Sequence, residues 1–484
     1  MKIKIVSQNV RHCNDGEGHM VADRIPRICS LIDKYDPDVV GFQEVREKWL
    51  TAFTEHFSDR YEIHHKYRSD YGAEATTMMW RKSRFDCVEK GYFWLSSTPH
   101  IQSHSWDIGS GYDDFRICMW ATLKDKETGH TFTYFNTHYS FGDERHVRSN
   151  QLIRDHIREK HIDAAIVTAD YNFNNTSAGY RDMVRYMGDL NVDTVNAPRT
   201  TFTGYKKGRV GSPIDYIFYT KGTVKPITYH LMDEMFDGYF ASDHFGIYGE
   251  IELQEKLRLG SLDLNGEDAL PESLTKKARN KYACSILQYI TEAEIFGWQG
   301  VPAELLETWP AHYTRFTYAG KAPAPICYRP DLVTPVEVRE VDLDGEKGTL
   351  AIFEKTASHR SLCVVNGTLR TKKAAEAVLA EAEKAGEMPF FFMGGAGNLE
   401  SEAYETLKEK LTDIRMAVAA KNFAPTYQGF DGEVKVPAIS EMIFTNGAQC
   451  LPLAYEVKDG RYGKAQISDH NQVLATILMK NEEE

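Results

Sequence analysis

Residues 37–45 read PDVVGFQEV, an apolar run that ends in the polar pair Gln43 and Glu44. The last five of these residues, GFQEV at 41–45, have a counterpart in GWQGV at 297–301. Three further pairs of segments match in the same order along the chain: KIKIVSQNV at 2–10 with KLRLGSLDL at 256–264, TFTGY at 201–205 with TYQGF at 426–430, and SDH at 242–244 with SDH at 468–470. The four offsets, 256, 254, 225 and 226 residues, indicate an internal repeat.

The repeat predicts two copies of one domain, residues 1–253 and residues 256–484. A chain of 484 residues also exceeds what a single hydrophobic core usually organises. Fourteen of the 17 histidines lie before residue 254, so we expect the chemistry in the first copy.

The composition is that of a soluble globular protein, with 42% apolar and 26% charged residues. No run of about 20 apolar residues is present, so no membrane span is expected. The eight cysteines form no CxxC pair, which is typical of reduced thiols and favours a cytoplasmic location. A net charge of −13 disfavours a broad binding face for duplex DNA, because such binding depends on neutralising phosphates.

Hydrophobic periodicity in the first copy predicts a mixed α/β domain. Helices are expected near 21–35 and 145–159, where apolar residues recur at helical spacing. Because many strands are interspersed with helices along the chain, we expect sheets that pack face to face, with the helices on their outer faces. The expected strands are 3–9, 38–43, 75–80, 116–123, 131–137, 164–168, 214–219 and 246–252.

Polar residues stand repeatedly at the ends of these apolar strands, where several strands can converge on one pocket. They are Asn9, Glu44, His138, Asp170, Asn172, Asp215, Asp243 and His244. Carboxylates and amides without cysteine suit Mg²⁺ or Mn²⁺ better than zinc. Two histidines with separate carboxylate partners suit proton transfer at phosphate oxygens. Together these residues predict metal-assisted hydrolysis of a phosphoester.

Six of these segments, SQNV, GFQEV, FNTH, ADYN, SPIDYIF and SDH, resemble in order the motifs of the endonuclease/exonuclease/phosphatase family. The resemblance covers residues 1–253. It implies a four-layer sandwich, in which two packed β-sheets are flanked by helices, and the repeat implies that this fold occurs twice in tandem.

The resemblance also implies roles for individual residues. Glu44 resembles the principal metal ligand, with Asn9 and Asp243 nearby. Asp170 and Asn172 resemble the pair that activates water and holds the phosphate.

Two histidines and their partners complete the implied site. Asp215 resembles the carboxylate that orients His244, which then contacts the scissile phosphate. His138 resembles a second catalytic histidine of the deoxyribonuclease branch, and Glu74 has the spacing of its partner.

The resemblance to the family also includes two arginines. Arg46 and Arg116 resemble arginines that contact phosphate, since a guanidinium group offers forked donors. Arg11 stands where repair endonucleases of the family carry an acidic residue, which disfavours repair of abasic sites.

The second copy lacks most of this set when the repeat is projected onto it. Glu44 falls on Gly300, His138 on Thr368, and Asp170 with Asn172 on residues 394–397, which read GGAG. Asn9 falls on Asp263 and Asp215 on Glu441, and only Asp469 and His470 are unchanged. We therefore expect the second copy to be catalytically inactive.

The substrate class stays open at this point. A phosphorylated small molecule, a nucleotide or a short oligonucleotide fits the acidic composition. The alternatives are a true nuclease acting on DNA or RNA and, outside the enzymes, a non-catalytic binding or scaffold protein.

Overall fold

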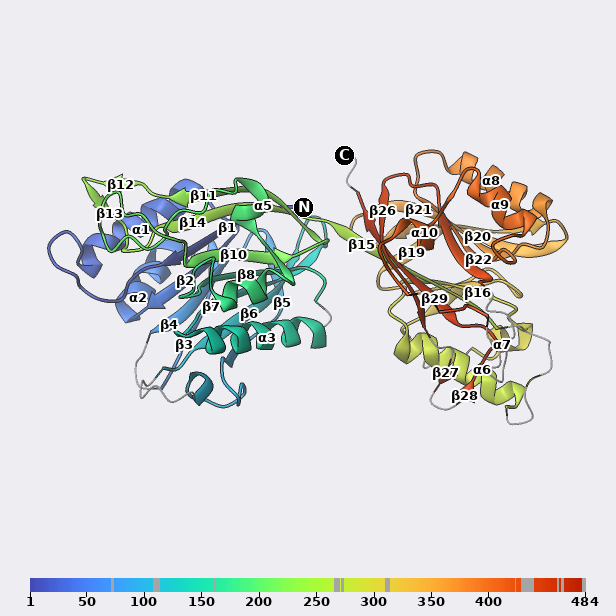
Figure 1. The fold of residues 1–484 in the computed structure, drawn as a ribbon, viewed down its shortest axis with the longest axis horizontal. Coiled ribbons are helices and arrows are strands. Elements are labelled where there is room, and N and C mark those ends of the chain that lie inside the picture. The colour runs from blue at the N-terminus through green and yellow to red at the C-terminus, as the bar shows by residue number, and fades with distance from the viewer. Residues whose placement is uncertain are drawn as a thin grey trace. The chain divides into compact units, whose positions relative to one another are not determined.

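The computed structural model describes residues 1–70, 74–107, 114–160, 162–264, 270, 274–309, 314–422, 424–427, 439–458, 461–462 and 465–480. The chain divides into two compact units, Met1–Gln254 and Glu255–Glu484 (Figure 1). Of the repeated segment 426–430, residues 428–430 lie outside the described part.

The first unit contains two six-stranded sheets. The strands of the first sheet, in spatial order, are β11 (Val224–Met232), β14 (Gly246–Leu253), β1 (Lys2–Asn9), β2 (Val39–Val45), β4 (Ala75–Arg81) and β3 (Tyr61–Tyr67). Those of the second are β5 (Phe85–Trp94), β6 (Ile117–Asp125), β7 (Thr131–His138), β8 (Ala165–Asp170), β10 (Asp215–Thr220) and β9 (Met187–Asp189). In each sheet one pair is parallel, β1 with β2 and β7 with β8, and the other pairs are antiparallel.

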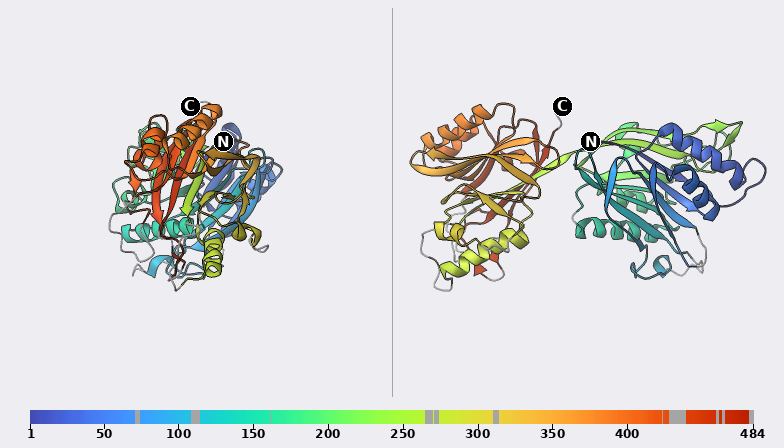
Figure 2. Two further views of the ribbon diagram at one scale, coloured as in Figure 1. Left: turned by 90° about the vertical axis from the view of Figure 1, so that its right-hand side faces the viewer. Right: turned by 180° about the vertical axis from the view of Figure 1, so that it is seen from behind.

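Helices cover the outer faces of both sheets (Figure 2). The first sheet packs against α1 (Val21–Tyr35) and α2 (Glu47–Phe57), and the second against α3 (Asp143–Glu159) and α4 (Ala178–Met183). Shorter elements are η1 (Ser105–Asp107), α5 (Leu190–Thr194), β12 (Met235–Phe236) and β13 (Tyr239–Phe240). This is the expected four-layer sandwich, and all the strands and both helices predicted from periodicity are present to within a few residues.

Strand β2 shows why the apolar run of residues 39–42 forms a central strand. Val39 belongs to the core between the two sheets, whereas Val40 and Phe42 pack toward the helices. A strand that is covered on both faces is apolar throughout rather than at alternate positions.

The second unit repeats the arrangement of two packed sheets. Its seven-stranded sheet has the order β17 (Thr317–Ala319), β18 (Ile326–Tyr328), β16 (Ile295–Gln299), β15 (Glu255–Asp263), β29 (Gln472–Met479), β26 (Cys450–Lys458), β24 (Ala420–Lys421). Its six-stranded sheet has the order β19 (Val333–Leu343), β20 (Glu346–Lys355), β21 (Ser361–Thr368), β22 (Phe390–Gly395), β25 (Glu441–Thr445), β23 (Thr412–Asp413). The remaining elements are α6 (Lys276–Ser285), η2 (Ile286–Ile290), α7 (Ala303–Glu307), α8 (Lys372–Ala385), α9 (Glu402–Lys408), α10 (Ile414–Ala417), β27 (Arg461–Tyr462) and β28 (Ala465–Gln466).

A buried polar link joins the two sheets of the first unit at the centre of the sandwich. Gln43 Nε2 donates to Asn136 Oδ1 at 2.8 Å, and Asn136 Nδ2 donates to the carbonyls of Phe42 and Thr77 at 3.0 and 2.9 Å. A Cβ on Gly41 would lie 2.4 Å from Asn136 Oδ1, so only glycine leaves room for this side chain.

The second unit contains the same link. Gln299 Nε2 donates to Asn366 Oδ1 at 2.5 Å, and Asn366 Nδ2 donates to the carbonyls of Trp298 and Pro325, both at 2.8 Å. A Cβ on Gly297 would lie 2.5 Å from Asn366 Oδ1. The match between GFQ and GWQ therefore has a structural reason, since the glycine and the glutamine accommodate the asparagine of the facing sheet.

No helix in the described ranges is both long and apolar enough to cross a membrane. All eight cysteines are free thiols.

Candidate active site

Strand register brings the predicted polar residues of the first unit to one edge of the sandwich. In the first sheet Asn9 is paired with Gln43, the neighbour of Glu44. In the second sheet Asp170 is paired with both His138 and Asp215. A hydrogen bond from Asn9 Nδ2 to Asp170 Oδ2, 2.9 Å long, joins the two sets across the sheets.

Glu44 occupies a β-bulge that turns its side chain into the site. The pairing of β2 with β4 shifts register between Phe42 and Val45, and Glu44 has a φ of 61°. Its carboxylate accepts hydrogen bonds from Asn9 Nδ2 at 3.0 Å and from the backbone N–H of His12 at 3.1 Å. Burial opposes the charge of this carboxylate, but the hydrogen bonds from His12 and Asn9 outweigh burial and hold the pKa of Glu44 well below its usual range.

Asp215 and His244 form a buried pair. His244 Nδ1 lies 2.9 Å from Asp215 Oδ2, and His244 Nε2 lies 3.8 Å from Asp170 Oδ2. Burial lowers the pKa of His244, but the carboxylates of Asp215 and Asp170 outweigh it and raise the pKa to about 10. Burial and the neighbouring charge of Asp215 raise the pKa of Asp170 to about 7. His244 is therefore a buried imidazolium that faces a carboxyl group of raised pKa.

His138 lies beside Asn172 and Asp170 rather than against a dedicated carboxylate. Its Nε2 is 3.1 Å from Asn172 Nδ2 and 3.5 Å from Asp170 Oδ2. Asn172 Nδ2 also donates to the carbonyl of Tyr139 at 2.9 Å, so this nitrogen is the donor and His138 Nε2 accepts. Burial and the nearby Arg116 lower the pKa of His138 well below its usual value, so the imidazole is neutral.

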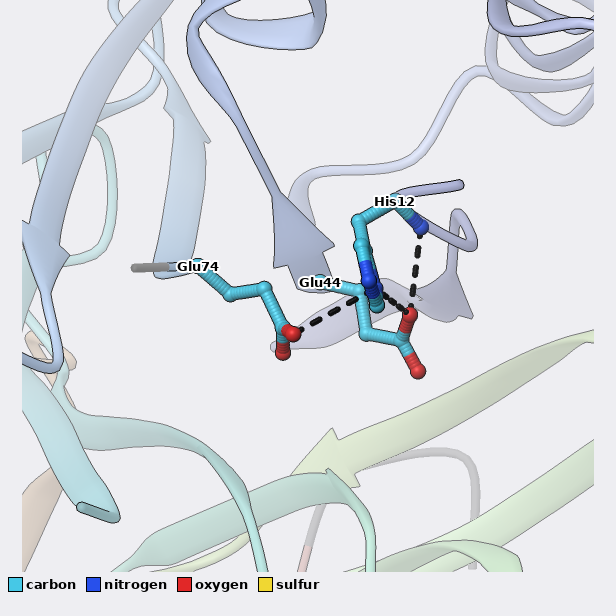
Figure 3. Close-up of side chains that lie close together, drawn as sticks. All are labelled: His12, Glu44 and Glu74. Atoms are coloured by element: carbon cyan, nitrogen blue, oxygen red, sulfur yellow. Dashed lines mark hydrogen bonds and ion pairs between the residues drawn. The ribbon is translucent and has the colours of Figure 1, made fainter. Parts of the chain in front are cut away.

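Glu74, expected beside His138, makes its contacts elsewhere. Glu74 Oε1 accepts from Arg68 Nη2 at 2.9 Å and lies 3.3 Å from His12 Nδ1. His12 Nδ1 is also 2.6 Å from Glu44 Oε2, so the imidazole of His12 lies between the two glutamates (Figure 3). The structure thus places Glu74 with His12, whereas His138 faces Asn172.

Asp243 lies at the rim of the site. Arg11 Nε approaches Asp243 Oδ2 at 3.7 Å, and Ser242 Oγ donates to Asp243 Oδ1 at 3.2 Å. Burial raises the pKa of Asp243, and the charge of Glu44 acts in the same direction. Arg11 thus provides a cation for Asp243.

The two predicted arginines differ in their surroundings. Arg116 is buried at the start of β6, where its Nε donates to Asp114 Oδ1 at 2.6 Å, and it lines a small cavity together with Glu44 and His138. Arg46 is exposed and precedes the first turn of α2. Only Arg116 is therefore buried with the site residues.

Sequence reasoning missed His12 and Arg68. His12 follows Asn9 by three residues, in the same turn after β1, and its position next to a strand-end motif was the available signal. Arg68 directly follows β3, and its backbone N–H donates to the Glu74 carbonyl at 3.0 Å. Neither residue belongs to a repeated segment.

The donor set of the site fits a divalent cation. One side-chain atom from each of His12, Glu44 and Glu74 lies within 4.8 Å of the others. Two of the three are carboxylate oxygens, the ligands that Mg²⁺ and Mn²⁺ prefer. Asn9 directs its amide nitrogen at Glu44 and its Oδ1 accepts from the backbone N–H of Arg11 at 2.9 Å, so in this arrangement it positions Glu44.

The corresponding edge of the second unit has a different set of side chains at the same register positions. Asp263 pairs with Gln299 as Asn9 does with Gln43, and Gly395 pairs with both Thr368 and Glu441. His470 Nδ1 lies 2.5 Å from Glu441 Oε1, and this pair corresponds to His244 and Asp215, which are 2.9 Å apart.

The positive φ angles correspond as well. Gly300 has a φ of 59°, close to the 61° of Glu44, and Gly397 has a φ of 73° where Asn172 has 52°. The backbone conformation of the bulge is thus present in both units, whereas the carboxylate of Glu44 is present only in the first.

Comparison with known proteins gives a family for the first unit. The model of the endonuclease/exonuclease/phosphatase family matches residues 6–244. Similar solved structures include a protein of that family from Bacteroides thetaiotaomicron, with 27% identity, a TM-score of 0.48, and coverage of 52% of this chain and 97% of the other. A mannosyl-6-phosphatase from the same organism has 28% identity, a TM-score of 0.46, and coverage of 52% and 100%.

A third similar structure is a family protein from Bacteroides vulgatus, with 26% identity, a TM-score of 0.48, and coverage of 52% and 100%. None of the curated proteins compared with the chain matches it. The match of the family model identifies an endonuclease/exonuclease/phosphatase family domain at residues 6–244.

Proposed function

We propose that residues 1–253 hydrolyse a phosphoester with the help of Mg²⁺ or Mn²⁺. One observation carries the proposal: a chain of contacts of 2.9–3.8 Å runs from Glu44 through Asn9 and Asp170 to His244 and Asp215, across both sheets. Hydrolases of this kind need a cation site and a proton-transfer site within one pocket, and the chain of contacts joins two such sets.

Glu44 would be the principal metal ligand, with His12 and Glu74 close enough to assist. Asp243, which lies near enough to sense the charge of Glu44, would be a further ligand. A bound divalent ion would stabilise charge on the phosphoryl oxygens and lower the pKa of a water molecule. His244, Asp170, Asn172 and His138 act on the substrate or on the attacking water.

Asp215 keeps His244 charged, so its Nε2–H can donate to a phosphoryl oxygen as negative charge develops there. Asp170 lies between His244 and Asn9 and is the acceptor for the proton of the attacking water. As the water oxygen bonds to phosphorus, the ester P–O bond breaks and the leaving alcohol takes up a proton from the surrounding water. Asn172 and neutral His138 are placed to hold the phosphoryl group in this orientation.

We propose that residues 256–484 are a degenerate, non-catalytic copy of this domain. Gly300 has no side chain that could ligate a cation, and Gly395 and Thr368 replace the acceptor carboxylate and the second histidine. What is left, Glu441 with His470, resembles the Asp215–His244 pair without the groups that this pair would serve.

The substrate we propose is a phosphorylated small molecule, a nucleotide or a short oligonucleotide, in keeping with the net charge of −13. The eight free thiols support a cytoplasmic location for the reaction.

Hydrolysis of p-nitrophenyl phosphate and bis-p-nitrophenyl phosphate with Mg²⁺ or Mn²⁺ tests the proposal, using the full chain and its Glu44→Gln variant. The matched control is Glu47→Gln, an exposed glutamate three residues away in the first turn of α2. We expect metal-dependent turnover that falls by at least about 100-fold in Glu44→Gln and is unchanged in Glu47→Gln. Turnover that persists in Glu44→Gln would exclude the proposed metal site. Absence of both turnover and calorimetric metal binding in the unmodified chain would favour a scaffold protein.

A further inference from the structure

His12 lies between the two glutamates of the candidate cation site and faces both of them with one nitrogen. His12 Nδ1 is 2.6 Å from Glu44 Oε2 and 3.3 Å from Glu74 Oε1 (Figure 3). Two donor atoms that bind one cation at about 2.1 Å, at right angles to each other, are about 3 Å apart. Both separations are close to this value, so one imidazole nitrogen and two carboxylate oxygens have the spacing of ligands that share an ion.

The three side chains are largely buried, so the charges of the two glutamates need compensation. The exposed fractions of the His12, Glu44 and Glu74 side chains are 18%, 13% and 8%. Arg68 pairs with Glu74 at 2.9 Å, but no lysine or arginine in the described part of the chain forms an ion pair with Glu44. A buried carboxylate without a cation is costly, and a divalent ion beside Glu44 would supply the missing charge.

The backbone around His12 is held in place by a buried arginine, independently of any ion. Arg24 is fully buried, and its guanidinium donates to the carbonyls of the residues on either side of His12, to Arg11 at 2.8 Å and to Cys13. The backbone N–H of His12 itself donates to Glu44 Oε2 at 3.1 Å. Because the fold fixes this turn, the imidazole faces the glutamates before an ion binds, which is the arrangement that favours tight coordination.

We propose that Nδ1 of His12 is a ligand of the cation, and that this nitrogen makes the site prefer Mn²⁺ over Mg²⁺. The inference rests on the proposed metal-dependent function and specifies its ion. Mg²⁺ is a hard cation that takes oxygen ligands, whereas transition-metal ions also accept the softer imidazole nitrogen. Mn²⁺ accepts both the nitrogen and the carboxylate oxygens, so His12 adds affinity for Mn²⁺ that it does not add for Mg²⁺.

The variant His12→Asn separates ligation of the ion from support of Glu44. Asparagine retains the backbone donor to Glu44 and a polar side chain that offers an amide oxygen and an amide N–H, but it removes the imidazole nitrogen. The matched control is His56→Asn, an exposed histidine on α2 whose Nε2 lies 2.7 Å from Asp33 Oδ2. The melting temperature of each variant without metal shows that it is folded before metal binding is measured.

The first measurement is the affinity of the full chain for Mn²⁺ and for Mg²⁺ by calorimetry, without substrate. We expect the unmodified chain and His56→Asn to bind Mn²⁺ more tightly than Mg²⁺. His12→Asn should lose at least about 10-fold in affinity for Mn²⁺, while its affinity for Mg²⁺ changes by less than about threefold. Equal losses for the two ions would make His12 a positioning residue for Glu44 and would overturn the inference, as would an unchanged affinity for Mn²⁺.

The second measurement is pulsed electron paramagnetic resonance of bound Mn²⁺, which detects nitrogen atoms coordinated to the ion and is blind to surface carboxylates. We expect nitrogen modulation in the unmodified chain and in His56→Asn, and none in His12→Asn. Bound Mn²⁺ without nitrogen modulation, or modulation that persists in His12→Asn, would overturn ligation by His12. If binding is then still lost in Glu44→Gln, the proposed function stands without this inference. Failure of the unmodified chain to bind either ion would reject both.

Discussion

The side chain of Asn136 holds the bulge that aims Glu44, so replacing it tests the connection between the fold and the site. Asn136 is fully buried in β7 and donates to the carbonyls of Phe42 and Thr77, which face each other where the β2–β4 pairing shifts. Asn136→Ala would remove the side-chain donor of these two buried carbonyls. Each such group costs about 1–3 kcal/mol, so we expect the first unit to lose about 2–6 kcal/mol of unfolding free energy.

Urea unfolding of the full chain gives the total loss, and hydrogen exchange of β2, β4 and β7 assigns it to the first unit. Asn366→Ala is the matched control, because Asn366 makes the same two backbone contacts in the second unit. That variant should speed exchange in β16, β18 and β21 and leave β2, β4 and β7 unchanged. A loss below about 1 kcal/mol in Asn136→Ala would refute the role of this polar link, because a single orphaned carbonyl should cost at least that much.

Two further predictions concern the buried histidine pairs. Asp215→Asn removes the carboxylate that keeps His244 protonated, so kcat/KM should fall by roughly 10³- to 10⁴-fold. The metal affinity measured by calorimetry should stay unchanged. Equal losses of kcat/KM and of metal affinity would show that Asp215 acts on the cation site instead. In the second unit the charges of Glu441 and Asp263 outweigh burial and raise the pKa of His470 to about 9. This pKa is above the value of about 6.5 in the unfolded chain, so the protonated His470 stabilises the folded second unit. The stabilisation is full below pH 6.5 and is lost as the pH rises through 9, by at most about 3 kcal/mol. Hydrogen exchange of β25 and β29 between pH 6 and 10, corrected for the intrinsic rate, should show this loss in the unmodified chain and not in Glu441→Gln. Identical pH profiles of exchange in the two proteins would contradict the pairing of His470 with Glu441.

The architecture of the first unit was predictable from the residue pattern of its central strands. These strands are either apolar throughout, because both faces are covered, or alternate regularly between apolar and polar residues. The runs at 39–42 and 164–167 are apolar throughout, as expected for strands between a sheet core and a helix layer. Strands β3 and β5 were missed for the opposite reason. Both lie at sheet edges and are largely polar or exposed, so they have no continuous apolar face to reveal them.

The site was predictable where a side chain ends a strand and less so where it lies in a turn or hairpin. Asp170, Asp215 and His244 end or flank strands whose register brings them together. The partner of Glu74 depends on how the hairpin of β3 and β4 folds over the site, and a single sequence spacing does not distinguish His138 from His12. Arg68 lies on the same hairpin, so its place in the cavity follows from three-dimensional packing alone.

The matched SDH segments of the two units allow the most direct test of the central claim, that the first unit alone performs the chemistry. The measurement is kcat/KM for metal-dependent hydrolysis of p-nitrophenyl phosphate by His244→Asn and by His470→Asn, each in the full chain. The account predicts a loss of at least about 10³-fold in His244→Asn and activity within about twofold of the unmodified chain in His470→Asn. Equal losses in the two variants, or a loss in His470→Asn alone, would contradict it.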